Sequence, residues 1–198
     1  MTTLRNLVGL PSSPSALSES ALILVDVQNT YLEGTLKLDG VDQSIVQIKS
    51  LLDRARTQNI PVIHIQHNAG VGSPYDVTQR IGQIADLVAP KEGEKVIVKS
   101  YPSSFEQTNL NETLSDLGIK KIIVVGYMSH MCINSTARAG FNLGYQVTVV
   151  ANATGTRDLP DPVDPSKTIP ASQIHSSVLA ALSDLPSIVV ANESDVPN

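Results

Sequence analysis

Six short apolar runs rich in Val and Ile constrain the fold of this chain more than any other feature of its sequence. They lie at residues 21–27, 61–66, 94–100, 121–126, 145–151 and 187–191. Each run has the length of a strand, and an uninterrupted apolar centre is typical of strands that are buried on both faces. The runs therefore predict a mostly parallel sheet of about six strands.

Segments with helical spacing separate these runs. Residues 41–58 carry one apolar stripe formed by Ile45, Ile48, Leu51, Leu52 and Ala55, and residues 106–117, 131–143 and 171–185 can be interpreted in the same way. Strands that alternate with helices favour an α/β fold, here a three-layer αβα sandwich. A length of 198 residues fits one domain, 1–198, in which residues 1–18 form an N-terminal extension.

Composition excludes several classes of partner. The net charge is −5 and the sequence contains no basic cluster, so we expect no nucleic-acid partner. No stretch approaches about 18 uninterrupted apolar residues, and the N-terminus lacks the apolar core of a signal peptide, so we expect no membrane partner and a cytoplasmic location. The single cysteine cannot form an internal disulfide, which fits a reducing compartment.

Two segments rich in Gly or Pro interrupt the alternation of strands and helices. Residues 67–76 and 157–170 are predicted to be loops, and the second contains four prolines. Loops of this length often shape the mouth of a binding site, but a tolerated surface insertion is an equally good interpretation.

Three reactive side chains fall at the ends of predicted strands, where open parallel sheets bind their ligands. Asp26 closes the first strand, Lys99 closes the third, and Cys132 follows the fourth after a short turn. Each also has a structural interpretation: a turn carboxylate, a solvated lysine and a small core residue. Together they supply the carboxylate, the ammonium and the thiol that a thiolate nucleophile needs.

The predicted position of Cys132, in the first turn of a helix, bears on its reactivity. Helix N–H groups and the helix dipole favour an anion there, so we expect a lowered thiol pKa and fast alkylation by iodoacetamide. Asp26 would take the thiol proton and pass it to a leaving group, while Lys99 keeps this carboxylate ionised and oriented. The backbone N–H of Cys132 and one from the preceding turn could bind an oxyanion.

The stretches "ALILVDVQNTYLEG", "VIVKSYPSSF" and "VVGYMSHMCINSTARAGFNLGYQVTVVANATGTRDL" resemble the isochorismatase-like cysteine hydrolase superfamily. This superfamily includes nicotinamidases, N-carbamoylsarcosine amidohydrolases and isochorismatases. The resemblance runs from about Ala21 to about Leu185 and implies a small-molecule substrate and a homo-oligomer, a dimer or larger. It also implies that Asp26, Lys99 and Cys132 form a catalytic triad. A cis peptide is implied between Tyr127 and Met128, with the N–H groups of Met128 and Cys132 in the oxyanion hole.

Metal-binding nicotinamidases carry a "DxH" sequence and further histidines after the second strand, and this chain departs from that pattern. His64 and His67 are three residues apart on a strand and therefore point to opposite faces. We expect no metal and no other cofactor, with these histidines acting as a core residue and a loop contact.

The cysteine also bears on the reaction. Isochorismatases cleave a vinyl ether with an acidic Asp and need no thiol, whereas a thiol beside an oxyanion hole favours attack on a carbonyl carbon. We therefore expect hydrolysis of an amide or ureido C–N bond through a Cys132 thioester. Isochorismate hydrolysis with Asp26 as the acid is the alternative. A catalytically inactive binding homologue and a redox-sensing cysteine are further hypotheses.

Five more residues are candidates for substrate binding. Gln28 either binds substrate or hydrogen-bonds the loop, and Tyr101 and Phe105 could wall the pocket, although Phe105 fits the core equally well. Tyr127 and His130 flank the predicted oxyanion turn.

Overall fold

The computed structural model describes residues 1–198 and contains a six-stranded sheet whose neighbouring strands are all parallel. The strand order is β3-β2-β1-β4-β5-β8. The strands are β1 (Ala21–Val25), β2 (Val62–His67), β3 (Lys95–Lys99), β4 (Lys121–Tyr127), β5 (Gln146–Gly155) and β8 (Ser187–Val190). All six predicted strands are therefore present, and their order places β1 and β4 side by side at the centre.

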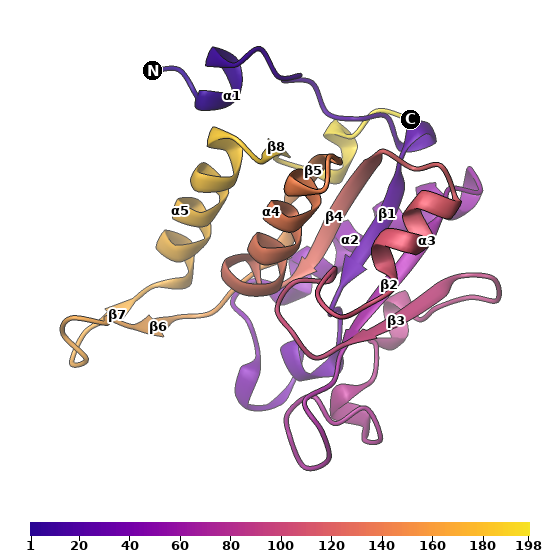
Figure 1. Ribbon diagram of the computed structural model, residues 1–198. Helices are drawn as coiled ribbons and strands as arrows, with labels where there is room; N and C mark the ends of the chain where they lie inside the picture. Colours follow the sequence, from indigo (N-terminus) through magenta and orange to yellow (C-terminus); the bar gives the residue numbers. More distant parts are fainter.

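Helices cover both faces of the sheet (Figure 1). The helix α2 (Val41–Thr57) packs on one face, and α3 (Leu110–Asp116), α4 (Asn134–Asn142) and α5 (Ala171–Asp184) pack on the other. Successive side chains of β1 point to opposite faces of the sheet. Leu22 and Leu24 pack in the core under α2, and Ile23 and Val25 pack in the core on the other face. The predicted three-layer αβα sandwich is confirmed.

Strand β3 differs from the prediction of a strand buried on both faces. It lies at the edge of the sheet, where Val96 and Val98 are 45% and 49% exposed while Ile97 and Lys99 are buried. Ile97 packs in the core that includes Leu110 and Leu114 of α3, whereas α2 packs mainly over β5 and has few contacts with β3. One face of β3 is therefore covered, and Lys99 lies on that face.

The remaining elements are short. The predicted loop at residues 157–170 contains a small antiparallel pair, β6 (Leu159–Pro160) and β7 (Thr168–Ile169), which projects from the body of the molecule (Figure 1). The first 18 residues include α1 (Leu4–Leu7). Single 3₁₀ turns lie at Leu17–Glu19, Asn29–Tyr31, Gly34–Leu36, Arg80–Gly82, Asp86–Val88 and Glu193–Asp195. None of the helices combines the length and the apolar character needed to cross a bilayer.

Candidate active site

The carboxyl ends of β1 and β3 and the turn after β4 bring the three predicted catalytic side chains together. The Nζ atom of Lys99 lies 2.7 Å from Oδ2 of Asp26 and 3.3 Å from Sγ of Cys132. The side chains of Asp26 and Lys99 are fully buried, and Cys132 is 6% exposed. The ammonium therefore contacts both the carboxylate and the sulfur, away from bulk water.

Local backbone geometry allows this approach. Asp26 has a left-handed conformation with φ 51°, which bends the chain immediately after β1, and its N–H donates to Ile65 O. On the neighbouring strand, a Cβ on Gly126 would lie 2.0 Å from Val25 O, so only glycine fits there. The close contact of β4 with β1 at Gly126 brings the cysteine turn beside Asp26.

The cysteine turn, residues 127–133, connects β4 to α4. It begins with a cis peptide bond between Tyr127 and Met128, as the resemblance implied. Ser129–Ile133 then form one wide turn in which the N–H of Ile133 donates to Met128 O. Wide turns of this kind are rare and are often found at functional sites. The N–H of Met128 donates to no backbone carbonyl, and this leaves it available to a bound group.

Lys99 has an acceptor for each of its three protons. Besides Asp26 and Cys132, its Nζ lies 3.1 Å from Nδ1 of His67. A lysine ammonium has three donors and no acceptor, so this arrangement satisfies it completely without water. Asp26 is satisfied less completely: besides the ion pair with Lys99, the Cys132 thiol and the backbone of His67 favour its ionised form, but neither contact has the geometry of a full hydrogen bond.

These surroundings set the protonation of the site. Burial raises the pKa of Asp26 above its ordinary value, although the Lys99 ammonium opposes the shift. Burial, followed by the charge of Asp26, raises the pKa of the Cys132 thiol to about 12, again against the effect of Lys99. The expected lowering of this thiol pKa is therefore wrong: Cys132 lies in the wide turn before α4 rather than in the first turn of that helix, and it is buried beside a carboxylate.

His67 belongs to the site, although the sequence analysis did not predict it as a site residue. It was predicted to be a loop contact, but it is the last residue of β2 and lies in register with Lys99, the last residue of β3. Burial, and then the charge of Lys99, lower the pKa of His67 to about 4, so the imidazole is neutral and its Nδ1 accepts from the ammonium. The rule that located Asp26 and Lys99, applied to β2, would have found His67.

His64 is a core residue, as predicted. It is buried, and its Nε2 lies 2.9 Å from Oε2 of Glu94. His64 and His67 do not meet, and the structure brings no three His, Cys, Asp or Glu side chains together as a metal-binding group.

The five residues predicted to bind substrate have different surroundings. Gln28 is fully buried, and its amide bonds with the backbone of His67 and Gly82, so it holds the loop. Tyr127 is also fully buried, with its hydroxyl 2.7 Å from Ser44 Oγ. Neither side chain has free surface to offer a substrate.

The other three are nearer to the surface. Phe105 is half-buried and stacks on Tyr145 at the edge of the core, which matches its alternative assignment. Tyr101 is 43% exposed and lies two residues after Lys99. His130 is half-buried, with its Nδ1 2.6 Å from Thr156 Oγ1. Tyr101 and His130 therefore remain the accessible candidates.

Comparison with known proteins places this chain in a family. The isochorismatase domain matches residues 20–165. The chain is 37% identical to the secreted isochorismatase effector of Verticillium dahliae, over 98% of both chains. It is 32% identical to the ureidoacrylate amidohydrolase RutB of Stutzerimonas stutzeri, over 74% of this chain and 75% of that protein.

A solved structure agrees with these sequence matches. The crystal structure of an isochorismatase from Pseudomonas putida superposes with a TM-score of 0.94 and 39% identity, over 99% of both chains. The chain is therefore a hydrolase of the isochorismatase family.

Proposed function

We propose that this protein hydrolyses an amide or ureido C–N bond of a small molecule through a thioester on Cys132. The observation that carries the proposal is the buried Lys99 ammonium, which contacts both Asp26 and Cys132. A core cysteine needs neither a carboxylate nor an ammonium beside it. A nucleophilic cysteine needs a group that takes its proton and a charge that holds that group in place.

The first half of the reaction forms the thioester. Because the pKa of Cys132 is raised to about 12, the resting residue is a thiol, and its proton moves to Asp26 as Sγ bonds to the carbonyl carbon. The carbonyl oxygen becomes an oxyanion, for which the N–H groups of Met128 and Cys132 are the proposed donors. The C–N bond then breaks, and the nitrogen leaves with the proton from Asp26.

The second half releases the acid. A water molecule gives a proton to Asp26 and attacks the thioester carbon. The new tetrahedral intermediate expels Cys132, which recovers its proton from Asp26. Amide and water thus yield carboxylic acid and amine, with the enzyme unchanged. The raised pKa of Asp26 suits this cycle, since the residue must alternate between base and acid.

Relatives support a C–N bond as the target. The RutB relative is named for the hydrolysis of a ureido compound, and its match extends over 74% of this chain. We propose Tyr101 and His130 as contacts for the substrate, because both remain accessible near the site.

The test compares wild-type protein with Cys132→Ala on a panel of primary amides, carbamoyl and ureido compounds, and isochorismate. We expect turnover of at least one C–N compound by the wild type and none by Cys132→Ala. Acid quench during turnover, followed by intact mass spectrometry, is expected to show the acyl group on Cys132.

Ser135→Ala is the matched control, because Ser135 lies three residues along the same segment and makes no side-chain hydrogen bond. It should retain wild-type turnover. C–N hydrolysis by Cys132→Ala at the wild-type rate would overturn the thioester.

Isochorismate hydrolysis is the second candidate function. It is favoured by the Verticillium dahliae relative and the Pseudomonas putida structure, both of which are named for isochorismatase. In that reaction Asp26 protonates the substrate and the thiol is not required. Isochorismate turnover that survives Cys132→Ala but is lost in Asp26→Asn would establish it in place of C–N hydrolysis.

Assembly and location are further parts of the proposal. We propose a homo-oligomer in which the projecting β6–β7 pair contacts a neighbouring copy, and light scattering of the purified protein tests it. We also retain the cytoplasmic location and a site that works without a metal or cofactor. Because the Verticillium dahliae relative is named as secreted, fractionation of cells from their medium is the relevant measurement of location.

A further inference from the structure

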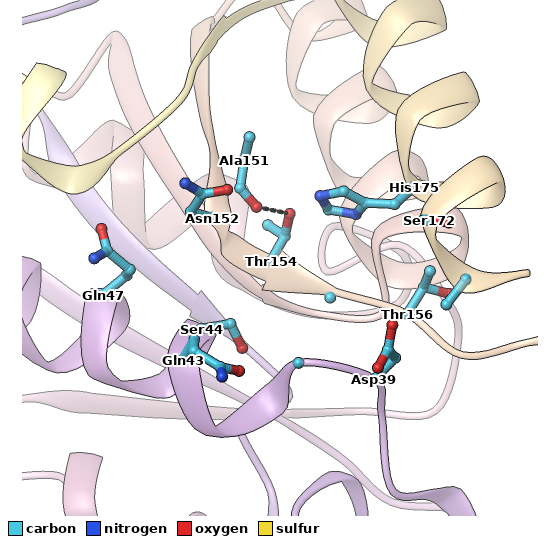
Figure 2. A pocket seen from close by; sticks show the side chains of 13 residues that line it. Asp39, Gln43, Ser44, Gln47, Ala151, Asn152, Thr154, Thr156, Ser172 and His175 are labelled. Carbon is cyan, nitrogen blue, oxygen red and sulfur yellow. Dashed lines mark hydrogen bonds between the residues drawn. The ribbon is translucent and has the colours of Figure 1, made fainter.

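A polar cavity of about 390 Å³ lies between α2, the end of β5 and the start of α5 (Figure 2). None of Asp26, Lys99 and Cys132 lines it. Its volume is in the range of small-molecule sites, although such sites are usually more apolar. The cavity is therefore distinct from the catalytic triad and needs its own explanation.

The lining determines the chemistry of a ligand. Among its 13 residues only Ala151 and Ala171 are hydrophobic. The others include three side-chain amides and four hydroxyl groups, which both donate and accept hydrogen bonds. They are Gln43, Gln47 and Asn152, and Ser44, Thr154, Thr156 and Ser172. Helix α2 begins at this wall with Gly40 and no side-chain cap, which leaves N–H donors in its first turn.

The residue types that are absent are equally informative. No Lys, Arg, Phe, Tyr or Trp lines the cavity, and Asp39 contributes the one carboxylate. The one ring in the lining is the imidazole of His175, whose pKa is lowered by burial. A phosphate or another polyanion would meet no Lys or Arg, and a flat aromatic compound would find no Phe, Tyr or Trp on which to stack. A small uncharged molecule with several hydroxyl groups matches a lining of amides and hydroxyls.

Three lining side chains hydrogen-bond the cysteine turn. Ser44 Oγ lies 2.7 Å from Tyr127 OH, Thr156 Oγ1 lies 2.6 Å from His130 Nδ1, and His175 Nδ1 lies 3.1 Å from Ser129 Oγ. They come from α2, from the residue after β5 and from α5, and Figure 2 shows them around one space. The cavity wall is therefore connected to three residues of the turn that carries Cys132.

We propose that this cavity is a second binding site, for a small uncharged polyhydroxylated molecule, and that its occupancy alters the cysteine turn. A ligand hydroxyl that bonds Thr156 or His175 competes with the bonds these side chains make to His130 and Ser129. The ligand thereby changes the position of the turn, and hence the reactivity of Cys132.

Binding is tested without any substrate, so the result does not depend on the proposed function. Wild-type protein is titrated with glycerol, D-ribose and myo-inositol while thermal unfolding is followed. Polyols also stabilise proteins generally, by exclusion from the surface, and that effect does not saturate. Site binding predicts a saturating rise in Tm for at least one of the three.

Two variants of α2 locate the site. Gln43 lines the cavity and makes no side-chain hydrogen bond, so Gln43→Trp should fill it and abolish the saturating rise. Val46 is exposed on the same helix outside the cavity, so Val46→Trp should keep it. A failure of all three polyols with the wild type, or equal saturation in Gln43→Trp, would overturn the site.

Coupling to the turn is measured by alkylation of Cys132 with iodoacetamide. A saturating polyol should change the rate by about fivefold or more in the wild type. Thr156→Val removes the bond to His130 while keeping the shape of the side chain, so it should reduce this change when the polyol is supplied at a concentration that saturates the Tm rise of the variant itself. A polyol that saturates the wild type but leaves the alkylation rate unchanged would overturn the coupling.

Discussion

A fully buried ion pair and a partly buried one in this protein contain the same kinds of groups, and the pKa values of their carboxylates shift in opposite directions. At the carboxyl edge of the sheet, Lys99 pairs with Asp26, and His67 lies beside them. Near the amino edge, Arg56 pairs with Glu94, and His64 lies beside them. The pKa of Asp26 is raised, whereas that of Glu94 is lowered to about 2.

The difference is in burial and in the hydrogen bonds that each carboxylate accepts, since Asp26 is fully buried whereas the side chain of Glu94 is 11% exposed. Burial alone would raise the pKa of Glu94, but Arg56 donates twice to it, and the N–H of Lys91 and the ring of His64 bond it as well. Asp26 pairs with the single ammonium of Lys99, and although the Cys132 thiol and the backbone of His67 also lower its pKa, burial outweighs all three. A carboxylate with several well-directed bonds holds structure together, and one with a single well-directed partner beside a thiol can exchange a proton.

The largest expected effect comes from Lys99→Met. It leaves Asp26 fully buried without its cation, so we expect a loss of about 3–5 kcal/mol in the free energy of unfolding and loss of turnover. Urea denaturation measures the first and the substrate panel the second. The double variant Asp26→Leu with Lys99→Met should recover most of the stability and none of the turnover. Stability unchanged in Lys99→Met would contradict the buried ion pair.

The raised pKa of Cys132 predicts slow alkylation. At neutral pH, iodoacetamide should react with the folded protein roughly two to three orders of magnitude more slowly than with a free cysteine, because so little thiolate is present. The charge of Asp26 raises this pKa and that of Lys99 lowers it, so the rate should increase in Asp26→Asn and decrease in Lys99→Met. Urea-unfolded protein is the control, and its rate should match that of the free amino acid. Fast labelling of the folded wild type would contradict the raised pKa of Cys132 and support the lowered pKa that was expected from the sequence.

Glu94 gives a smaller effect with a defined pH dependence. Its pKa is depressed in the folded protein, so its contribution to stability is complete above the unfolded value of about 4.3 and is lost as the pH falls towards about 2. Glu94→Gln should cost about 2 kcal/mol at neutral pH and make stability less dependent on pH between these values. Denaturation across this pH range measures both effects. A wild-type slope in Glu94→Gln would contradict the assignment, and turnover should be unaffected.

Asp26 contributes to the pH dependence with the opposite sign. Its folded pKa is raised, so the stability linked to it falls as pH rises from the unfolded value through the folded one. The two ion pairs therefore oppose each other in the acid range. Glu94→Gln removes the contribution of Glu94, so the dependence of its stability on pH in the acid range should show the opposite contribution of Asp26.

The sequence was enough to predict the layers and the meeting of Asp26, Lys99 and Cys132 at one edge of the sheet, because both depend on regular rules. Apolar runs gave the strands, and the carboxyl ends of parallel strands located Asp26, Lys99 and Cys132. Protonation could not be predicted, because burial depends on the segments that cover a residue. The exposed face of Val96 and Val98 depends in the same way on a helix that packs elsewhere. The contact of Arg56 with Glu94 joins residues that are 38 apart, and no local pattern indicates it.

The two histidines of β2 test the difference between the two ion pairs, with the smallest expected effects. His67 accepts from Lys99, so His67→Phe leaves one ammonium proton without an acceptor, and we expect turnover to fall about tenfold. His67→Gln can supply a carbonyl acceptor and should recover part of the loss. Since His67 is neutral above its pKa of about 4, neither variant should move the pH profile of turnover at neutral pH.

His64→Phe is the matched variant at the Glu94 pair. It should lower stability and leave turnover unchanged, because His64 contacts Glu94 and not Lys99. A positioning role for His67 also predicts that His67→Phe changes the alkylation rate of Cys132, since Lys99 contacts both residues. Equal losses of turnover in His67→Phe and His64→Phe, with no change in alkylation, would reduce His67 to a packing residue. The distinction between the two ion pairs would then rest on Asp26 alone.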